Sequence, residues 1–262
     1  MLSQFFLIAP FLPYLVYAGD DDVNKTGPIT SAFTDPLSNI TFQRFFGQRS
    51  TFSFGIALPT NKTTDFIGQM TFPTPSGDGW GGIALAGNMV GPLLLAAWPN
   101  GEQVVSTFRR ASSKSSPPVL DGPFQIKEIK EGTKINSTHM QFTFLCQGCL
   151  GLNGTLGFET PDAAGNVQMG WALASTSVTT KGDPASEMTF HDSGFGIFTA
   201  QLSLAKSPDF AKWAALATGG GSAAPVVPAP AGTPTPALNR PVPIASPTTA
   251  TRPKKVDKYE RL

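Results

Sequence analysis

The chain has 262 residues, with 19 Lys and Arg against 18 Asp and Glu, so its formal net charge is +1. That balance gives no indication of a nucleic-acid partner. Only two histidines are present, which nearly excludes zinc and copper sites built on several imidazoles. The sequence also has no Walker loop and no Gly-x-Ser-x-Gly elbow, and no pair of carboxylates stands out to support a glycosidase.

Residues 1–18 are predicted to be a signal peptide. The apolar run 5–17 is followed by Ala18 and then by an acidic segment, and it is too short to span a bilayer. We therefore expect a secreted, extracellular protein. The N-glycosylation sequons agree with this, since each can carry a glycan only on exposed chain of a secreted protein. The sequon asparagines are Asn24, Asn39, Asn61, Asn136 and Asn153.

Residues 19–216 are predicted to form one folded domain of the all-β class. Short runs rich in Phe and Thr recur between Gly, Pro, Asn and Asp, which is typical of a two-sheet antiparallel, immunoglobulin-like sandwich. The predicted strands are 40–45, 51–58, 66–72, 82–86, 93–98, 103–108, 124–129, 140–145, 167–174 and 195–202. Only 204–217 has a helical pattern, with Ser203 or Ser207 at its start and Gly219 after its end.

The segment 80–101 differs from the other predicted strands because small residues gather in it. These are Gly81, Gly82, Ala86 and Gly87. They leave the backbone bare enough for a flat ligand to approach closely. Met89 follows in a predicted loop, where a core methionine is less expected than in a strand. Taken alone, this segment leaves two interpretations open: Met89 fills a gap in the sandwich, or it contacts a ligand.

Alternation in 135–146 assigns the residues of one strand to two faces. Met140, Phe142, Phe144 and Cys146 share the first face. His139 falls on the other face with Gln141 and Thr143, next to a sequon, and we expect that face to be solvated. His139 is therefore predicted to be an exposed surface histidine and a poor candidate for catalysis or metal binding.

Cys146 and Cys149 are the only cysteines, and they form a Cys-Gln-Gly-Cys motif. In a cytosolic protein this spacing would suggest a redox or metal motif. Zinc would need more ligands than the chain offers, and a secreted protein favours oxidised cysteines. A small structural disulfide between Cys146 and Cys149 is the preferred interpretation.

Residues 217–262 are predicted to be a disordered linker rich in Pro, Thr and Ala that ends in a basic tail over 252–262. Such a composition cannot bury enough apolar surface to offset the entropy of ordering. The tail is more simply a solvated end than a docking site. No apolar stretch there is long enough for a membrane span or a lipid-anchor signal, so we expect no membrane partner.

Several segments in order resemble the cytochrome domain of fungal cellobiose dehydrogenases, a DOMON-type haem or sugar-binding sandwich. They are 53–59, 65–68, the glycine-rich stretch 80–101, 136–139, 146–149, 170–173 and 190–198. The resemblance covers about 40–213, essentially the whole predicted domain. One departure is that Ser112, Ser113 and Lys114 follow Arg109-Arg110-Ala111, where the family has Thr-Gly-Tyr near the haem propionates.

The resemblance implies a b-type haem whose iron is held by Met89 and His191. Met/His ligation fills both axial positions and suits electron transfer, and the lack of Cys-x-x-Cys-His argues against covalent attachment. Asp192 would either orient the His191 ring or cap a turn. By analogy, the partners are a separate dehydrogenase or other reductant and an acceptor such as a lytic polysaccharide monooxygenase, a quinone or ferric iron. Without a flavin domain, we expect no catalytic site beyond a candidate ferric reductase activity.

Two other interpretations remain open. In the first, the chain is a haem-free carbohydrate-binding sandwich that stacks sugars on Trp80, Trp98 or Trp171. Core packing is the simpler role for each tryptophan. Alternatively, it is an incomplete piece of a longer flavoenzyme or membrane reductase. A sugar-binding module would not need Met89 together with His191, so this pair discriminates the first alternative from a cytochrome.

Overall fold

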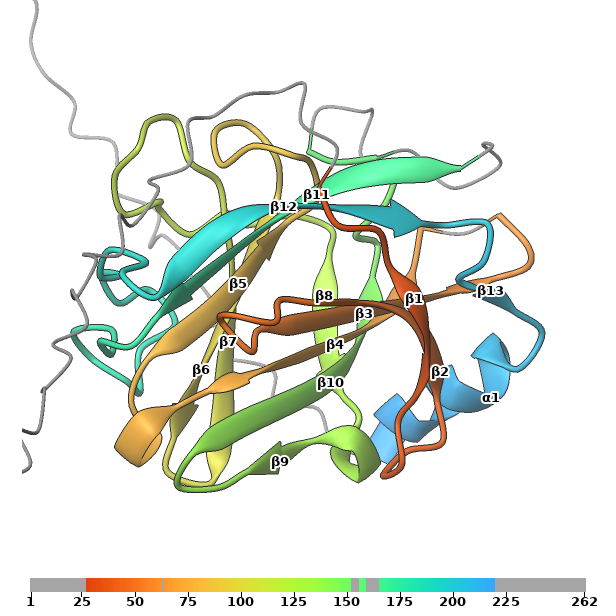
Figure 1. Ribbon diagram of the computed structural model, residues 1–262, viewed down its shortest axis with the longest axis horizontal. Coiled ribbons are helices and arrows are strands. Elements are labelled where there is room, and N and C mark those ends of the chain that lie inside the picture. The colour runs from red at the N-terminus through yellow and green to blue at the C-terminus, as the bar shows by residue number, and fades with distance from the viewer. Residues whose placement is uncertain (1–26, 63, 152–155, 159–164, 220–262) are drawn as a thin grey trace, which may run out of the picture. The chain divides into compact units, whose positions relative to one another are not determined.

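The structure is a computed structural model that describes residues 27–62, 64–151, 156–158 and 165–219 (Figure 1). The described chain forms two packed sheets, so the all-β sandwich prediction is confirmed. The predicted signal peptide, and all of the predicted tail beyond residue 219, lie outside the described residues. Within the described part, no helix has the length and hydropathy needed to cross a membrane.

The first layer, here called the large sheet, has the strand order β1-β2-β3-β4-β10-β8, with β9 beside β10 and β13 beside β3. Its strands are β1 (Ser31–Thr34), β2 (Thr41–Phe46), β3 (Ser53–Pro59), β4 (Phe66–Pro73), β8 (Gln125–Glu128), β9 (Lys134–Ile135), β10 (His139–Gln147) and β13 (Lys206–Ser207). The second layer, the small sheet, has the order β12-β11-β5-β6-β7. It comprises β5 (Trp80–Ala84), β6 (Leu94–Asn100), β7 (Gln103–Arg109), β11 (Asn166–Ala174) and β12 (Gly194–Gln201).

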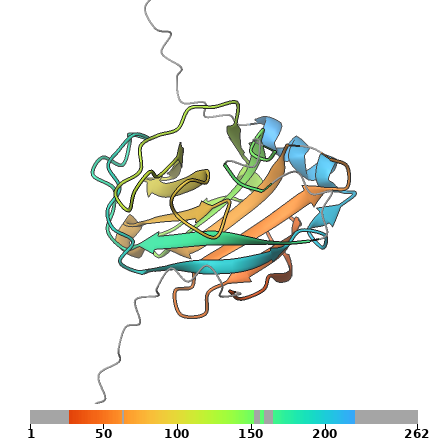
Figure 2. The ribbon, with the colours of Figure 1, turned by 90° about the horizontal axis from the view of Figure 1, so that it is seen from above.

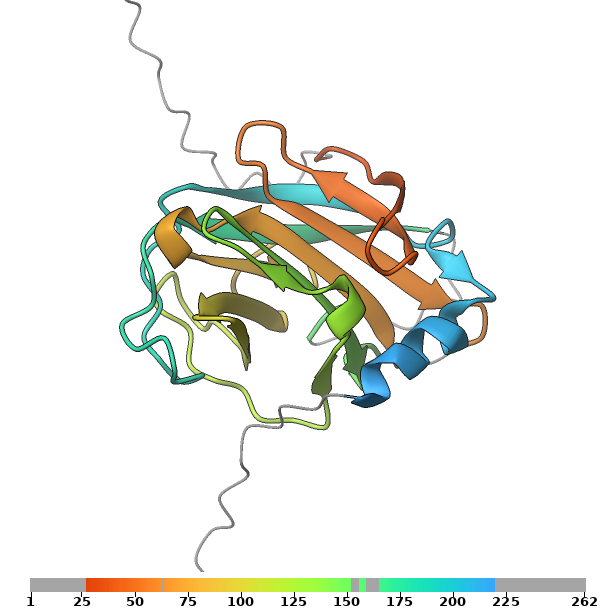
Figure 3. The ribbon, with the colours of Figure 1, turned by 90° about the horizontal axis from the view of Figure 1, so that it is seen from below.

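Figures 2 and 3 show the two sheets from above and below. Aromatic side chains fill the space between them. Phe45 of the large sheet stacks on Phe198 of the small sheet, with ring centroids 4.7 Å apart. Phe52 stacks on Trp171 at 5.3 Å. Offset aromatic pairs of this kind add to the free energy gained from burying their area, and they fix how the sheets face each other.

The outer face of the large sheet has a smaller core of its own. Helix α1 (Phe210–Ala215) buries Phe210 and Trp213 against Ile40 and Phe42 of that sheet. Figure 3 shows the helix, in blue, apart from β11 and β12. This face is therefore covered by the chain itself.

The predicted helix 204–217 was wrong at its start. Lys206 and Ser207 form β13, which pairs in parallel with β3. Ser207 precedes Pro208, and the proline ring disfavours helical dihedrals in the residue before it. The α-helix therefore begins only at Phe210, and a short 3₁₀ turn, η3 (Leu216–Gly219), follows it.

The prediction for β10 held for His139 and failed for Thr143. His139 is exposed, whereas Thr143 is fully buried. A 3₁₀ turn, η2 (Lys130–Gly132), covers this part of the face, and the Thr143 hydroxyl donates to the Gly132 carbonyl at 2.6 Å. Gln69 of β4 donates to the same hydroxyl at 2.9 Å. Around Thr143 this face is therefore internal, and its polar groups are paired with each other, while its His139 end is exposed.

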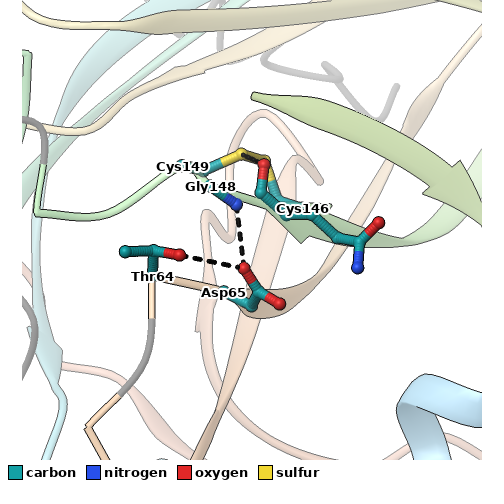
Figure 4. The surroundings of a disulfide bond; sticks show 6 residues. Thr64, Asp65, Cys146, Gly148 and Cys149 are labelled. Atoms are coloured by element: carbon teal, nitrogen blue, oxygen red, sulfur yellow. Dashed lines mark hydrogen bonds between the residues drawn. A yellow bond between two sulfur atoms is a disulfide. The ribbon is translucent and has the colours of Figure 1, made fainter. Parts of the chain in front are cut away.

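The predicted disulfide between Cys146 and Cys149 is confirmed, and both residues are buried (Figure 4). Asp65 accepts hydrogen bonds beside it from the Gly148 amide at 2.8 Å and the Thr64 hydroxyl at 3.2 Å. The Leu150 amide donates to the Thr64 carbonyl at 2.9 Å. Together these bonds tie the end of β10 to the start of β4.

Replacing Cys146 and Cys149 together by alanine is expected to destabilise the protein by about 2 kcal/mol, since the closed loop is short and loop closure in the unfolded chain is the main term. Urea unfolding of the wild type and the double variant measures this difference. A loss beyond about 5 kcal/mol would contradict a purely local role.

Candidate functional site

Small side chains occupy the middle of the outer face of the small sheet. A Cβ built on Gly81 would lie 2.6 Å from the Phe72 ring, so Gly81 faces the large sheet. Ile83, Leu95 and Leu173 belong to the core between the sheets. Because strand residues alternate, the residues between them face outward. On β11, β5 and β6 these outward residues are Gly82, Ala84, Ala96, Gly170 and Ala172, here called the cradle.

The cradle is continuous across three strands. Ala172 pairs with Gly82 and Gly82 with Ala96, while Gly170 pairs with Ala84 in the neighbouring row. Backbone this bare lets a flat group approach the sheet closely. Of the two neighbouring glycines singled out in the sequence, Gly82 faces outward as part of the cradle, whereas Gly81 faces the large sheet. The sequence did not specify which of the two would face outward.

His191 lies at one end of the cradle, just before β12. Its ring is 4.6 Å from the Phe195 ring and 6.4 Å from the Trp80 ring, measured between centroids. Gly196 faces inward against Trp171, so its neighbour Phe195 faces outward. Trp80 lies on the outer face of β5, in the same cluster as Ala96. His191 therefore stands on the cradle side of the sheet, where β5 begins.

Met89 lies toward the opposite end, in the loop 85–93 that follows β5. A Cβ on Gly87 of this loop would lie 3.1 Å from Gln168 and 3.8 Å from Ile197, which are outward residues of β11 and β12. Met89 itself is half-buried. Since His191 stands where β5 begins and this loop leaves where β5 ends, the structure places Met89 and His191 toward opposite ends of one cradle.

The His191 imidazole is half-buried, and burial lowers its pKa below the ordinary 6.5, an effect only partly offset by its own backbone and by Asp192. Its Nδ1 atom is buried and has no hydrogen-bond partner among the described residues. A neutral imidazole is the form that binds metal ions. Burial therefore favours the form of the ring that a ligand role requires.

Asp192 anchors the chain next to His191. Its carboxylate accepts hydrogen bonds from the Ser175 amide at 2.8 Å and from the Ser175 and Thr176 hydroxyls at 3.0 and 3.3 Å. Burial raises its pKa, but the bonds from Ser175, Ser193 and Thr176 outweigh this and leave the pKa below 3.8. Of its two suggested roles, the structure supports fixing a turn, because these bonds run to the start of the loop 175–193 and not to the imidazole.

Two of the tryptophans that the alternative interpretation offers as sugar platforms, Trp80 and Trp98, hold the loop 175–193 in place. Trp80 donates to the Thr189 hydroxyl at 3.0 Å, and Trp98 donates to the Lys181 carbonyl at 2.8 Å. Both indoles are buried, and Trp171 packs between the sheets. Because the indole faces of Trp80 and Trp98 are buried, a sugar ring cannot stack on them. This agrees with the core-packing role.

An ion pair adds a further anchor to this loop. Lys181 lies 2.7 Å from a carboxylate oxygen of Asp78, which also accepts from the Ser177 hydroxyl at 2.7 Å. The bond from Lys181, with that from Ser177, lowers the Asp78 pKa below 3.8. Both side chains of the pair are partly exposed, at 35% and 50%, so solvent screens the interaction.

The lowered pKa predicts how Asp78→Asn depends on pH. The stabilisation is present above the unfolded pKa of about 3.9 and is lost as the pH falls through the lower folded value. We expect the wild type to be more stable than Asp78→Asn by at most about 1 kcal/mol at neutral pH. That difference should shrink in urea titrations toward about pH 2. A difference that stays constant with pH would contradict the ionic role.

Large apolar side chains around the cradle are uncovered. Phe190 is 72% exposed, Phe195 42% and Val90 37%. Phe190 also contacts the His191 ring, with centroids 4.4 Å apart. An apolar area of this kind next to a cluster of converging groups is typical of a ligand site. The exposure of Phe190 and Phe195 was not predicted from the sequence, because exposed apolar residues at a strand end produce no hydrophobic periodicity.

Three of the five sequon asparagines, Asn39, Asn61 and Asn136, are exposed. Asn24 and Asn153 lie outside the described residues. No group of three or more His, Cys, Asp or Glu side chains that could hold a metal ion occurs in the described ranges.

Comparison with known proteins gives a consistent result. The family model of the cytochrome domain of cellobiose dehydrogenase matches residues 33–212. A pyrroloquinoline quinone-dependent pyranose dehydrogenase of Coprinopsis cinerea is 30% identical in an alignment over 179 residues, and the match covers 65% of this chain and 24% of that protein. The chain thus spans about a quarter of the length of the curated relative it matches.

Two solved structures are similar to this chain. The cytochrome domain of Myriococcum thermophilum cellobiose dehydrogenase has a TM-score of 0.65 and 33% identity, and the match covers 72% of this chain and 96% of that one. The cytochrome b domain of pyranose dehydrogenase from Coprinopsis cinerea has a TM-score of 0.64 and 24% identity over the same shares, a likeness of fold.

Proposed function

Because this chain belongs to the family of cytochrome domains of cellobiose dehydrogenase, we propose that it binds haem b and carries single electrons outside the cell. The observation that supports this most strongly is the position of Met89 and His191 toward opposite ends of a cradle of small residues. A thioether and a neutral imidazole on one bare face are the donor set of an electron-transfer haem. The residues present therefore fit the group.

When bound, haem b supplies a one-electron ferric/ferrous couple. Met89 and His191 would hold its iron, and a thioether paired with an imidazole suits electron transfer. Trp80, Phe190 and Phe195 would enclose the His191 side in apolar surface. No Cys-x-x-Cys-His motif exists in the chain, so attachment is non-covalent.

The loop 175–193, which carries His191, is pre-organised for this role. Trp80, Trp98 and Asp192 each hold the loop 175–193 through a hydrogen bond. A redox centre held by fixed ligands changes its geometry little when it gains an electron, so pre-organisation favours transfer. Ser112, Ser113 and Lys114 stand where the family has Thr-Gly-Tyr, so this chain would hold the propionates by other groups.

The proposed setting is extracellular. The predicted signal peptide, the exposed sequons Asn39, Asn61 and Asn136, and the Cys146–Cys149 disulfide support it. Glycans on these three asparagines are part of the proposal.

The relatives that match are dehydrogenases or parts of them, which suggests the class of donor. We infer that this chain accepts electrons from a dehydrogenase or small reductant. It would pass them to a lytic polysaccharide monooxygenase, a quinone or ferric iron. The exposed Phe190 and Phe195 offer an apolar contact beside the site.

Rapid mixing tests this function. The secreted protein, reduced with dithionite and freed of excess reductant, is mixed with each acceptor while the haem absorbance is followed. Oxidation whose rate rises with acceptor concentration would support an electron shuttle. A reduced protein that reoxidises at the same rate with and without every acceptor would contradict it.

A further inference from the structure

Arg109, the last residue of β7, is a buried arginine bonded to backbone carbonyls. It is 2% exposed. Its guanidinium donates to the carbonyl oxygens of Pro184 and Ser186, each at 2.7 Å, and of Pro117 at 2.9 Å. Burial lowers its pKa, partly offset by Asp183, yet an arginine stays charged. Pro184 and Ser186 belong to the loop 175–193, which carries His191.

Arg110 makes the corresponding contact with the other loop. Its Nε donates to the Gly91 carbonyl at 2.8 Å. The Gly91 amide donates in turn to the Ala111 carbonyl at 3.0 Å, next to a parallel bridge between Val90 and Ala111. Val90, the first residue of the Met89 loop that makes these contacts, directly follows Met89 in the chain. A cavity of about 340 Å³ lies beside these bonds, between the loop 85–93 and the segment that follows β7, so the bonds replace close packing there.

We propose that Arg109 and Arg110 are positioning residues that brace the two ligand loops from one three-residue segment, 109–111. Adjacent residues at a strand end point to opposite sides, so one arginine reaches the His191 loop and its neighbour reaches the Met89 loop. Charge-assisted hydrogen bonds to carbonyls are stronger than neutral ones. The segment therefore fixes the spacing between Met89 and His191. This inference rests on the proposed haem site.

The residue type matters at both positions. The planar guanidinium presents several donors in a fixed fork, and Arg109 uses two of its nitrogens for three carbonyls. A lysine at 109 offers a single ammonium that cannot reproduce that geometry. A lysine at 110 can still donate one bond to the Gly91 carbonyl. Arg109→Lys should therefore weaken the brace, and Arg110→Lys should largely restore what Arg110→Ala loses.

Amide hydrogen exchange on the full-length, haem-free protein tests the brace without any cofactor. Arg110→Ala should speed exchange about tenfold in 85–93, since one hydrogen bond is lost. Arg109→Lys should do the same in 176–190, while β4 and β10 keep wild-type rates. The matched control is Arg49→Ala, which removes an exposed arginine from the turn between β2 and β3. Unchanged loops, or equal acceleration in β4 and β10, would overturn the proposal.

The haem-loaded protein gives the second readout. Arg110→Ala should weaken the near-infrared methionine-to-iron charge-transfer band and lower the reduction potential, because thioether ligation raises it. Arg110→Lys should recover most of both. Faster loop exchange together with an unchanged potential and band would overturn a positioning role. If the wild type binds no haem, the proposed function fails, while exchange alone still decides whether the brace exists.

Discussion

His191→Ala is expected to fold and to lose its haem. Removing a partner outside the coordination sphere already costs roughly 10- to 100-fold in metal affinity, and removing the ligand itself should cost more. His191 is half-buried before β12, so truncation leaves the sheets intact. The measurement is the ratio of haem absorbance to protein after purification, with circular dichroism to verify the fold.

The chain offers a matched control, since its only other histidine is His139. His139 is exposed and bonded to the Thr138 hydroxyl at 3.0 Å. His139→Ala should retain a full complement of haem. If both variants lose haem alike, or neither does, His191 is not the imidazole ligand.

Ala172→Trp is expected to exclude the haem by filling the cradle. Ala172 faces outward from β11 and is only partly buried, so a larger side chain would project over Gly82 and displace part of the cluster around Trp80 and Ala96 without entering the core between the sheets. We expect at least about a hundredfold loss of haem affinity, since the indole occupies space that the ligand needs, with stability lowered by roughly 1–3 kcal/mol, as is typical of a small-to-large change.

Ala172→Ser is the control for this variant, because it changes polarity at nearly constant volume. It should bind haem like the wild type in a titration of the haem-free protein. Full haem binding by Ala172→Trp would show that the ligand does not sit over this part of the sheet, and it would move the site elsewhere.

The strands of the sandwich were largely predictable because the runs that form them are Phe-rich, short and separated by turn residues. All ten predicted strands have a counterpart in the structure, whereas β1, β9 and β13 were missed. These three have 4, 2 and 2 residues, too few for a pattern to stand out. The early helix start was overruled by a tertiary contact, the pairing of β13 with β3.

The candidate site was predictable only in part. Met89 and His191 came from the family resemblance, and the bare cradle was indicated by glycines near Met89. Which of Gly81 and Gly82 faces outward depends on strand register. Two adjacent glycines are identical, so the sequence does not distinguish them. Arg109 was not identified as buried, because an Arg-Arg pair at a strand end normally indicates a solvated turn.

Burial of Arg109 shows how stability and function are linked in this fold. A buried charge is costly unless it is hydrogen-bonded, and here three carbonyls accept from its two terminal nitrogens, while Nε has no partner among the described residues. The same bonds hold the loop that carries His191. A group whose burial would otherwise destabilise the protein thus serves to position a site.

The central claim is that Met89 and His191 hold a b-type haem. It is tested most directly by an absorption spectrum of the secreted protein, oxidised and then reduced with dithionite. We predict a Soret band that shifts on reduction, with sharp α and β bands that are lost in Met89→Ala and His191→Ala. A folded protein with no Soret band, even after haem is supplied, would contradict the claim.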